Sequence, residues 1–393
     1  MTEFKTVLQD DLLTRCAERA PIYDRENRFF QEDFDELREA GYLRAAVPES
    51  FGGLGLSLAE VVREQQRLAY HAAPTALATN MHLYWTGIAA DLHRSGDASL
   101  DWLLEETVAG EVFAAGHAES GNDVPVLHST TGAKRVDGGY VFNGRKSFGS
   151  LGPAWTRLGL HGLDTTDPEN PKVVHAFAPR GADGMTTIAT WDDVLGMRAT
   201  RSDDTKLENL FVPSERIARV VPAGFAGIDQ FVLGIFGWAL LGFAHIYYGL
   251  ARRVFDDTVA RLHKKSSIVL TRGSMRHHAG VEHDIADMAL ELEAIGPHID
   301  RIADDWSAGV DHGHGWGVKI VAAKFHAVEG AWRVVDRALD VSGGFGIFPA
   351  SGIERMLRDA RLGRLHPANS YLTRELVGKA MLGVDLDVQP RWG

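Results

Sequence analysis

The stretch GGFGIFPASGIERMLRDARLGRLHPANSYLTR, residues 343–374, decides the fold of this 393-residue chain. It opens on a glycine-rich bend, residues 343–346, in which Gly343 and Gly344 can adopt positive φ and let other groups approach the backbone. Such a bend suits a loop that passes a cofactor or a phosphate, although a helix C-cap explains it equally well. The stretch closes on His366 and Asn369, whose side chains can donate and accept hydrogen bonds.

Three sequence patterns follow one another along the chain. Apolar residues recur at helical spacing in residues 1–113, alternate with a period near two in residues 114–218, and return to helical spacing in residues 219–393. In the first region, Ser57 and Glu60 have the spacing of a capping box before a helix that resumes near Leu58. We therefore expect an α+β fold, mainly α, with a helical domain, a largely antiparallel β domain and a second helical domain.

Composition and charge disfavour several classes of partner. The formal net charge of −12 offers no basic field for nucleic-acid phosphates or an anionic membrane, so we expect neither. The single cysteine, Cys16, cannot form an intramolecular disulfide and fits a reducing compartment. The opening residues MTEFKTVLQDDLLTRC carry acidic residues where an export signal has a basic region and an apolar run, so we expect a cytoplasmic location.

One segment has the length of a membrane span. Residues 231–250, FVLGIFGWALLGFAHIYYGL, contain His245 and two tyrosines as their ionisable residues. Four glycines interrupt the segment, and the amphipathic helical pattern ARRVFDDTVARLHKK continues directly after it. We therefore expect a central helix of a bundle.

Motifs over nearly the whole chain resemble the acyl-CoA dehydrogenase superfamily. The segment VPESFGGLGLS (47–57) resembles the family's N-terminal loop, and GGYVFNGRKSFGSLGP (138–153) resembles the hairpin whose tip lies against the flavin ring. The glycine-rich bend and ERMLRDA (354–360) resemble the C-terminal signature. This resemblance implies a C-terminal four-helix bundle and an assembly of two or four identical chains, with FAD bound between the subunits.

The resemblance also implies flavin contacts at particular positions. Ser150 aligns with the family's hydroxyl next to flavin N5, and Phe148 aligns with an aromatic residue against the ring. Ser120 lies at the place of the family's Gly-Ser-Asp flavin loop, and Asn369 aligns with a threonine that contacts the cofactor. Hydroxyls, backbone donors and a flat apolar cover suit a flavin, because its ring system carries carbonyl and nitrogen acceptors. We expect the hairpin tip and the glycine-rich bend to close around that ring.

The family's catalytic glutamate is missing from this sequence. Its position aligns with Pro367, and the alternative location on the first long bundle helix, QFVLGIFG (230–237), contains no carboxylate. His366 is the nearest titratable residue, and an imidazole could abstract an activated proton or supply one in oxygen chemistry. A histidine that only packs or binds backbone is the more common situation, and Glu375 is a poorer candidate.

The segment with which the family reaches a neighbouring subunit's FAD is altered. Residues 268–288, IVLTRGSMRHHAGVEHDIADM, keep the end of the family pattern but lack its Phe-Gly and Gln. Asp340 replaces another family glutamine, and its negative charge disfavours a nearby pyrophosphate. Four basic residues could compensate at FAD or at the phosphate of FMN, although a solvated basic face is equally consistent: Lys264, Lys265, Arg272 and Arg276. The resemblance therefore implies FAD, with FMN open.

Two other classes of site are disfavoured. The clusters around His277-His278 and His312 to His314 lack metal-ligand geometry, because adjacent histidines on a helix point about 100° apart and no carboxylate or cysteine completes a set. We expect no metal. A serine hydrolase is disfavoured because the sequence contains no Gly-x-Ser-x-Gly motif.

Three functions remain open. The first is α,β-dehydrogenation of an acyl thioester with an atypical or absent base. The electrons would pass to an electron-transfer partner. The local sequence RMLRDARLG (355–363) favours this function. The second is a two-component monooxygenase, in which a reductase supplies reduced flavin for hydroxylation of nitrogen, sulfur or an aromatic carbon. The third is a catalytically degenerate subunit that stabilises an active partner. Tyr84, Trp85 and Trp238 could line a substrate pocket, but aromatic residues at helical positions are commonly core.

Overall fold

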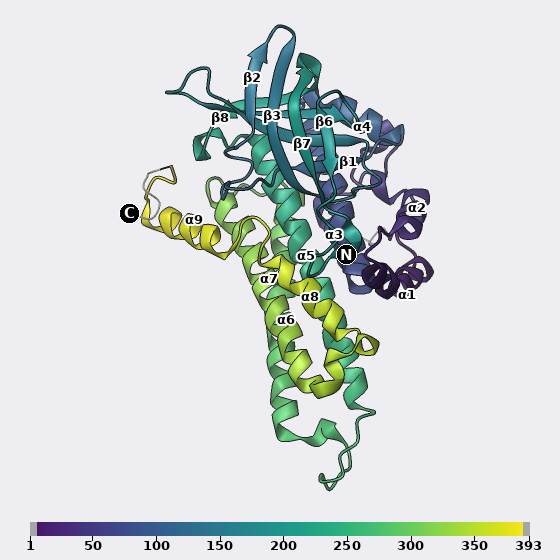
Figure 1. Cartoon of the computed structure of the whole chain (residues 1–393). Coiled ribbons are helices and arrows are strands. Elements are labelled where there is room, and N and C mark those ends of the chain that lie inside the picture. The colour runs from purple at the N-terminus through teal and green to yellow at the C-terminus, as the bar shows by residue number, and fades with distance from the viewer. Residues whose placement is uncertain (1–5, 388–393) are drawn as a thin grey trace.

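The sheet of this protein lies across the upper ends of its long helices (Figure 1). The computed structural model describes residues 6–387. Within that part of the chain the order of elements is helical, sheet and helical, as the sequence predicts.

The N-terminal region contains one long helix and three shorter ones. The long helix begins at the predicted capping box, where the backbone N–H of Ser57 donates to Glu60 Oε2 at 2.8 Å. It is kinked at Ala72, which has non-helical φ and ψ, because Pro74 lacks an N–H and its ring interferes with the preceding turn. The bounds are α1 Asp10–Glu26, α2 Gln31–Glu39, α3 Leu58–Arg94 and α4 Asp101–Val108.

The middle region forms one eight-stranded sheet in the order β6-β7-β3-β2-β4-β5-β8, with β1 paired to β4. β4 pairs in parallel with β1 and β2, and the other pairs are antiparallel, in agreement with the largely antiparallel sheet expected. The bounds are β1 Phe113–Gly116, β2 Gly132–Val136, β3 Gly139–Gly149, β4 Arg157–Asp164, β5 Lys172–Pro179, β6 Met185–Ile188, β7 Asp203–Pro213 and β8 Ile217–Pro222.

The C-terminal region contains three long helices followed by two short ones. These helices confirm the return to helical spacing that the sequence shows in residues 219–393. The glycine-rich bend joins the third long helix to the first short one. The bounds are α5 Gln230–Leu262, α6 Ala279–Ser307, α7 Gly315–Ser342, α8 Ile353–Gly363 and α9 Ser370–Leu382.

α5 is the central helix of the molecule. It is long and apolar enough to cross a membrane, but 78% of its most apolar 18-residue stretch is buried inside the fold. It packs closely on α3, because Gly87 has no side chain where the Trp238 ring lies. Apolar burial against α3 and α7 therefore accounts for its composition.

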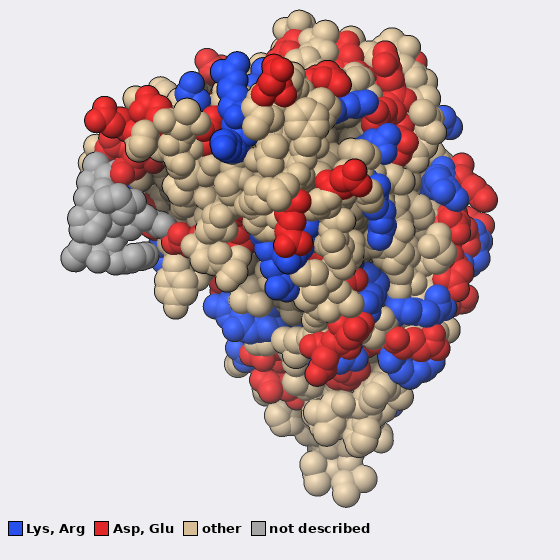
Figure 2. All heavy atoms as spheres, turned by 45° about the horizontal axis from the view of Figure 1, so that its top comes forward, with Lys and Arg blue, Asp and Glu red and all other residues tan. Residues whose placement is uncertain are grey.

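Charged side chains of both signs are interspersed over the face drawn in Figure 2. No continuous basic field appears on that face, in keeping with the net charge of −12. Cys16 is buried in the N-terminal core.

Candidate functional site

A cavity of about 310 Å³ lies where the sheet meets α3, α5 and the segment after α8. Its walls come from the ends of β1 and β3, the loop before β7, two helices and the α8–α9 linker, which we define as residues 364–369. Since these segments are far apart in sequence, the cavity depends on the tertiary fold. We call it the junction cavity.

The sheet side of the junction cavity carries hydroxyl groups and aromatic rings. Ser150 Oγ lies 2.8 Å from Ser202 Oγ, which lies 2.7 Å from Thr200 Oγ1. The Phe148 ring is 59% exposed and meets the Trp191 ring edge-on, with the centroids 5.9 Å apart. Phe148 has a φ of 60°, a conformation that is rare outside glycine and clusters at functional sites. This wall suits a flat ring with a polar edge.

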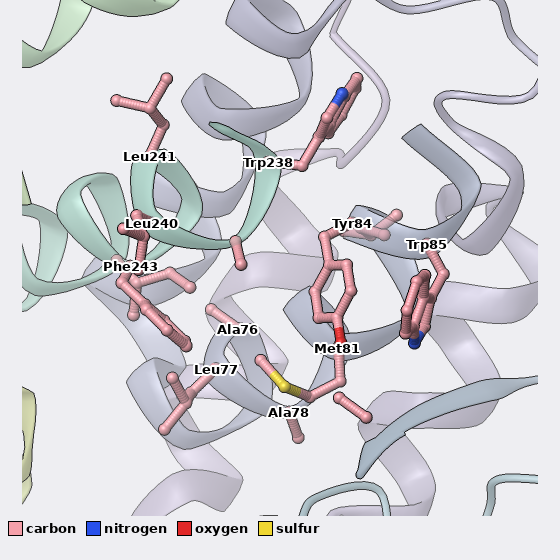
Figure 3. Close-up of a cluster of buried hydrophobic side chains, with 14 of the residues drawn as sticks. Ala76, Leu77, Ala78, Met81, Tyr84, Trp85, Trp238, Leu240, Leu241 and Phe243 are labelled. Atoms are coloured by element: carbon pink, nitrogen blue, oxygen red, sulfur yellow. The ribbon is translucent and has the colours of Figure 1, made fainter. Parts of the chain in front are cut away.

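The helical side of the junction cavity is mainly apolar. Figure 3 shows Leu77 and Met81 of α3 beside Leu240 and Phe243 of α5. Further apolar lining residues on this side are Ile235, Phe236, Ala239, Leu365 and Leu372. None of the described lining residues is a lysine or an arginine. A cationic partner for an anionic ligand is therefore missing from the described walls.

Both acidic lining residues belong to the β1–β2 loop on the sheet side, and they are Glu119 and Asp123. Glu119 Oε1 lies 2.6 Å from Lys146 Nζ and also accepts a hydrogen bond from Thr131 Oγ1 at 2.6 Å. Burial raises the pKa of Glu119, but the Lys146 ammonium and the hydrogen bonds outweigh burial and lower it to about 2. Glu119 is therefore an ionised partner of Lys146 and a poor proton acceptor.

His366 lies in the α8–α9 linker and lines the junction cavity. Its Nε2 atom lies 2.9 Å from the Tyr247 hydroxyl oxygen, and its ring stacks on Phe243 with the centroids 4.6 Å apart. Burial, and secondarily the Lys324 ammonium, lowers the pKa of His366 to about 3. The imidazole is therefore neutral at ordinary pH and a weak base. Its predicted acid–base role stays a prediction.

A buried lysine on α7 holds the α8–α9 linker in place. Lys324 Nζ donates to the carbonyl oxygens of Gly363, His366 and Ala368 at 3.2, 2.8 and 3.0 Å. At the other end of the linker, Asn369 Oδ1 caps α9 by accepting hydrogen bonds from the backbone N–H groups of Tyr371 and Leu372. Both ends of the linker are thus fixed, which positions His366 in the cavity wall.

A second histidine lines the junction cavity on the sheet side. His117 follows β1, and its Nδ1 lies 3.3 Å from the Tyr84 hydroxyl oxygen. Its Nε2 is buried and has no hydrogen-bond partner within residues 6–387. Burial lowers the pKa of His117 well below its ordinary value. His117 is therefore a neutral imidazole in the cavity wall, with one ring nitrogen unpartnered within the described residues.

Some of the predicted site residues come together at the junction cavity. Phe148, Ser150, His366 and Asn369 all line it. Ser120 lies in the β1–β2 loop next to the lining residue Glu119, but it is exposed and does not itself line the cavity. The hairpin tip and the α8–α9 linker therefore face one another, although they are more than two hundred residues apart in sequence.

The remaining predicted residues lie elsewhere. Gly343 and Gly344 follow α7 and are exposed, and Lys265 Nζ lies near Gly343. Arg272 is exposed in the α5–α6 loop, and this loop lies at the lower end of the molecule (Figure 1). The expectation that the glycine-rich bend closes on the hairpin tip is therefore wrong within one chain. The 11 residues of α8, about 16 Å of helix, separate the bend from the linker that takes that place. A contact of the bend with a neighbouring subunit's cofactor stays a prediction.

The sequence patterns did not indicate some of the residues that line the junction cavity, and they suggested others that lie in the core. Tyr84 lines the junction cavity, whereas Trp85 and Trp238 are core residues with hydrogen bonds to Ala114 O and Asp91 Oδ2. His117 and Trp191 belong to no recognised motif, so only a strand-end position next to the Ser120 loop could have indicated His117. Within the described residues, no group of three or more potential ligands could hold a metal.

Comparisons with known proteins assign the family. The family models for the acyl-CoA dehydrogenase N-terminal and C-terminal domains match residues 2–100 and 241–371. The chain is 30% identical over 383 residues to the amino sugar nitrososynthase DnmZ of Streptomyces peucetius, covering 91% of this chain and 88% of that protein. It is 28% identical over 347 residues to the putative acyl-CoA dehydrogenase YdbM of Bacillus subtilis (strain 168), covering 88% and 87%.

A solved structure has the same fold. KijD3, in complex with FMN and dTDP-3-amino-2,3,6-trideoxy-4-keto-3-methyl-D-glucose, superposes with a TM-score of 0.82 at 24% identity, over 96% of this chain and 93% of that one. The matching models cover both helical regions and the relatives extend over nearly the whole chain. This protein therefore belongs to the acyl-CoA dehydrogenase superfamily of flavin-dependent oxidoreductases.

Proposed function

We propose that this protein is a flavin-dependent monooxygenase that transfers one oxygen atom from dioxygen to a small, uncharged and largely apolar substrate. The observation that carries this proposal is the helical wall of the junction cavity, which contributes no carboxylate. Pro367 stands at the family's base position, and the pKa of His366, about 3, is too low for a base that removes an α-proton near neutral pH. The similarity to a nitrososynthase supports oxygen chemistry over dehydrogenation.

The residues at the junction cavity fit a flavin ring. The hydroxyls of Ser150 and Ser202 can bind its polar edge, and Phe148 and Trp191 can cover one face. Bound in reduced form, a flavin supplies the two electrons that activate dioxygen, so that one oxygen atom enters the substrate and the other leaves as water. The neutral imidazole of His366, whose Nε2 lies 2.9 Å from the Tyr247 hydroxyl oxygen, would line the space that a substrate could occupy.

The lining of the junction cavity supports an uncharged substrate. Substrates with phosphate, sulfinate or carboxylate groups are bound through arginine, lysine or concentrated backbone donors, and the described lining contains neither cation. The apolar wall from α3 and α5 instead fits an aromatic, heteroaromatic or thioether compound. Dehydrogenation of an acyl thioester remains the competing function, and a degenerate partner subunit is a third.

The proposal includes a reductase as the source of reduced flavin and an assembly of two or four copies of the chain. Large exposed apolar side chains support assembly, among them Ile268, Val269, Ile347, Phe348 and Leu382. The described lining of the junction cavity holds no lysine or arginine, so the phosphate of FMN would need cationic groups outside that lining. Full-length FAD would need a second copy of the chain to place Arg272 and the glycine-rich bend at the cofactor. Heat release of the bound flavin followed by chromatography distinguishes the two cofactors.

Two assays test the proposed chemistry. In the first, flavin-loaded protein is mixed anaerobically with a panel of acyl-CoAs, and the visible absorbance of the oxidised flavin should not bleach. In the second, a flavin reductase, NADH and isotopically labelled dioxygen are supplied with indole, thiophene and thioether compounds, and a product one labelled oxygen atom heavier should appear. Bleaching by an acyl-CoA without oxygen transfer would establish dehydrogenation. A protein that cannot be loaded with FMN or FAD would support the partner-subunit role.

His366 can be tested in the oxygen-transfer assay. The His366→Ala variant removes the imidazole held by Tyr247, and we expect it to form less product per reduced flavin consumed. His314→Ala, at an exposed histidine, is the matched control. Unchanged coupling in His366→Ala would remove this residue from the mechanism.

A further inference from the structure

A second cavity of about 200 Å³ lies between α1, the kink of α3, the C-terminal half of α5 and the start of α8. It shares no lining residue with the junction cavity. Its charged lining residues are Arg253, Arg261, Arg355 and Asp257. We call it the arginine cavity. Its wall therefore carries three guanidinium groups and one carboxylate.

The acidic residue of this wall is already engaged. Arg253 Nε donates to Asp257 Oδ2 at 2.8 Å, which leaves the positive charges of Arg261 and Arg355. The carboxylate that pairs with Arg355 is Asp359, whose Oδ2 lies 3.7 Å from Arg355 Nη1. Burial raises the pKa of Asp359 to about 6, so it is a reluctant counter-ion. Even with Asp359 ionised, the charge of the group remains positive.

Several donors of the arginine cavity have no acceptor. Arg261 Nη2 donates to the carbonyl oxygen of Ser351, but its Nη1 is buried without a hydrogen-bond partner in residues 6–387. The same holds for Arg355 Nε, on a side chain that is 11% exposed. His71 Nδ1 is also buried without a partner in those residues, as donor or acceptor according to the tautomer. Buried donors of this kind are normally satisfied, and guanidinium groups pair best with oxyanions. Arg261 and Arg355, which both line the arginine cavity, therefore each keep a guanidinium N–H without an acceptor.

The backbone adds to the positive field of the arginine cavity. The 11-residue helix α8 begins at its edge, and the N-cap residue Gly352 supplies no side-chain cap. The N-terminal end of a helix carries partial positive charge and free N–H groups. Ser351 Oγ already accepts the hydrogen bond of Ile353 N, so this first N–H group of α8 is not free. The start of α8 and the two guanidinium groups thus all contribute positive potential to the arginine cavity.

We propose that the arginine cavity binds a small tetrahedral oxyanion of the phosphate type, held by Arg261 and Arg355. A volume of about 200 Å³ accommodates inorganic phosphate, whereas pockets for larger ligands begin near 300 Å³. The site is independent of the proposed oxygen chemistry, because none of its lining residues reaches the junction cavity. The same chemistry would also take the phosphate of a monoester, and the test separates the two sources.

Binding is measured by titration calorimetry on the full-length, flavin-loaded protein in a phosphate-free buffer, with chloride holding the ionic strength constant. We expect saturable binding of inorganic phosphate and none of acetate or AMP. Binding of AMP as tight as that of phosphate would assign the site to a phosphate monoester. No saturable binding of either would overturn the proposal.

Substitutions locate the bound anion. Arg261→Gln and Arg355→Gln should each weaken phosphate binding by about tenfold or more, since each removes a charge-assisted pair. Arg135→Gln, at an exposed arginine on β2, is the matched control and should bind as the native protein does. The visible spectrum of the bound flavin reports whether each variant is folded. Native affinity in both variants would also overturn the proposal, whatever the outcome of the oxygen-transfer assay.

Discussion

Lys146 is the residue on which the sheet side of the junction cavity depends. Its side chain is 2% exposed, and its Nζ lies 2.6 Å from Glu119 Oε1 and 3.4 Å from His161 Nδ1. Burial lowers the pKa of Lys146 to about 8, against the opposing effect of Glu119. Both members of the pair are therefore charged near neutral pH, and each depends on the other because neither can reach water.

Removing this lysine should strongly destabilise the protein. Lys146→Met leaves the Glu119 carboxylate buried without its counter-ion, and breaking such a pair costs about 3–5 kcal/mol of unfolding free energy. Urea denaturation followed by circular dichroism measures the change. Lys134→Met, at an exposed lysine on β2, is the control and should change stability little.

A second substitution separates the lost pair from lost packing. Adding Glu119→Gln to Lys146→Met removes the uncompensated charge, so it should recover part of the stability. If the Lys146→Met protein were as stable as the Lys134→Met protein, the buried Lys146–Glu119 pair would contribute nothing to the free energy of unfolding.

At the scale of elements, the contact between α3 and α5 sets the shape of the junction cavity. Gly87 of α3 faces the Trp238 ring of α5, and a Cβ atom at position 87 would lie 2.3 Å from Trp238 Cδ2. Trp238 is 1% exposed and its Nε1 donates to Asp91 Oδ2, so the ring cannot move aside without losing that bond. The two helices can therefore be this close only while position 87 is glycine.

Gly87→Ala should lower the free energy of unfolding by about 1–3 kcal/mol or more, because it overpacks a filled core. Gly378→Ala on α9 is the matched control, since nothing lies within 4 Å of its added Cβ. That control should be neutral or stabilising by up to about 1 kcal/mol, because alanine is the better helix former. Thermal and urea unfolding measure both variants. Equal stability of the two would contradict the close α3–α5 contact.

For the molecule as a whole, buried neutral histidines govern its response to acid. Burial lowers the pKa of five of them, to about 4 for His82, to about 3 for His175 and His366, and well below the ordinary value for His117 and His161. The unfolded chain binds protons at these residues below pH 6.5, whereas the folded chain does not. Their contribution to stability is therefore present above pH 6.5 and is lost as the pH falls.

Two buried aspartates have the opposite effect on stability, because the folded chain binds their protons more tightly than the unfolded chain does. Burial raises the pKa of Asp33 and of Asp359 to about 6, so the folded chain holds these protons where the unfolded chain releases them, between pH 3.8 and pH 6. Five histidines opposed by two aspartates leave a net uptake of about three protons on unfolding near pH 5.5. The free energy of unfolding should then fall by about 4 kcal/mol between pH 6 and pH 5.

Urea midpoints at pH 7.5, 6 and 5 measure this acid sensitivity. His175→Phe should reduce the proton uptake on unfolding by about one, so the free energy of unfolding should depend less steeply on pH. The reason is that both ring nitrogens of His175 are buried and unpartnered within the described residues. His314→Phe, at an exposed position, should leave the slope unchanged. Stability that is constant or rising from pH 6 to pH 5 would contradict the assignment of neutral buried imidazoles.

The sequence by itself determined the order of helical, sheet and helical regions, because periodicity is a property of neighbouring residues. It also indicated the capping box at Ser57 and the motif residues Phe148 and Ser150, since each lies within a short recognisable segment. The same short segments could not show what faces them, because pairing between distant segments is not encoded in local spacing.

Only the tertiary structure decided which segments enclose the junction cavity and how their groups ionise. It placed the α8–α9 linker opposite the hairpin tip and left the glycine-rich bend beyond α8, because helix length and packing set the separation between consecutive motifs. It also lowered the pKa of His366, since Phe243, Tyr247 and Lys324 surround this imidazole only after α5 and α7 have packed on the linker. Burial and electrostatics arise from contacts between distant residues, so they exist only in the folded chain.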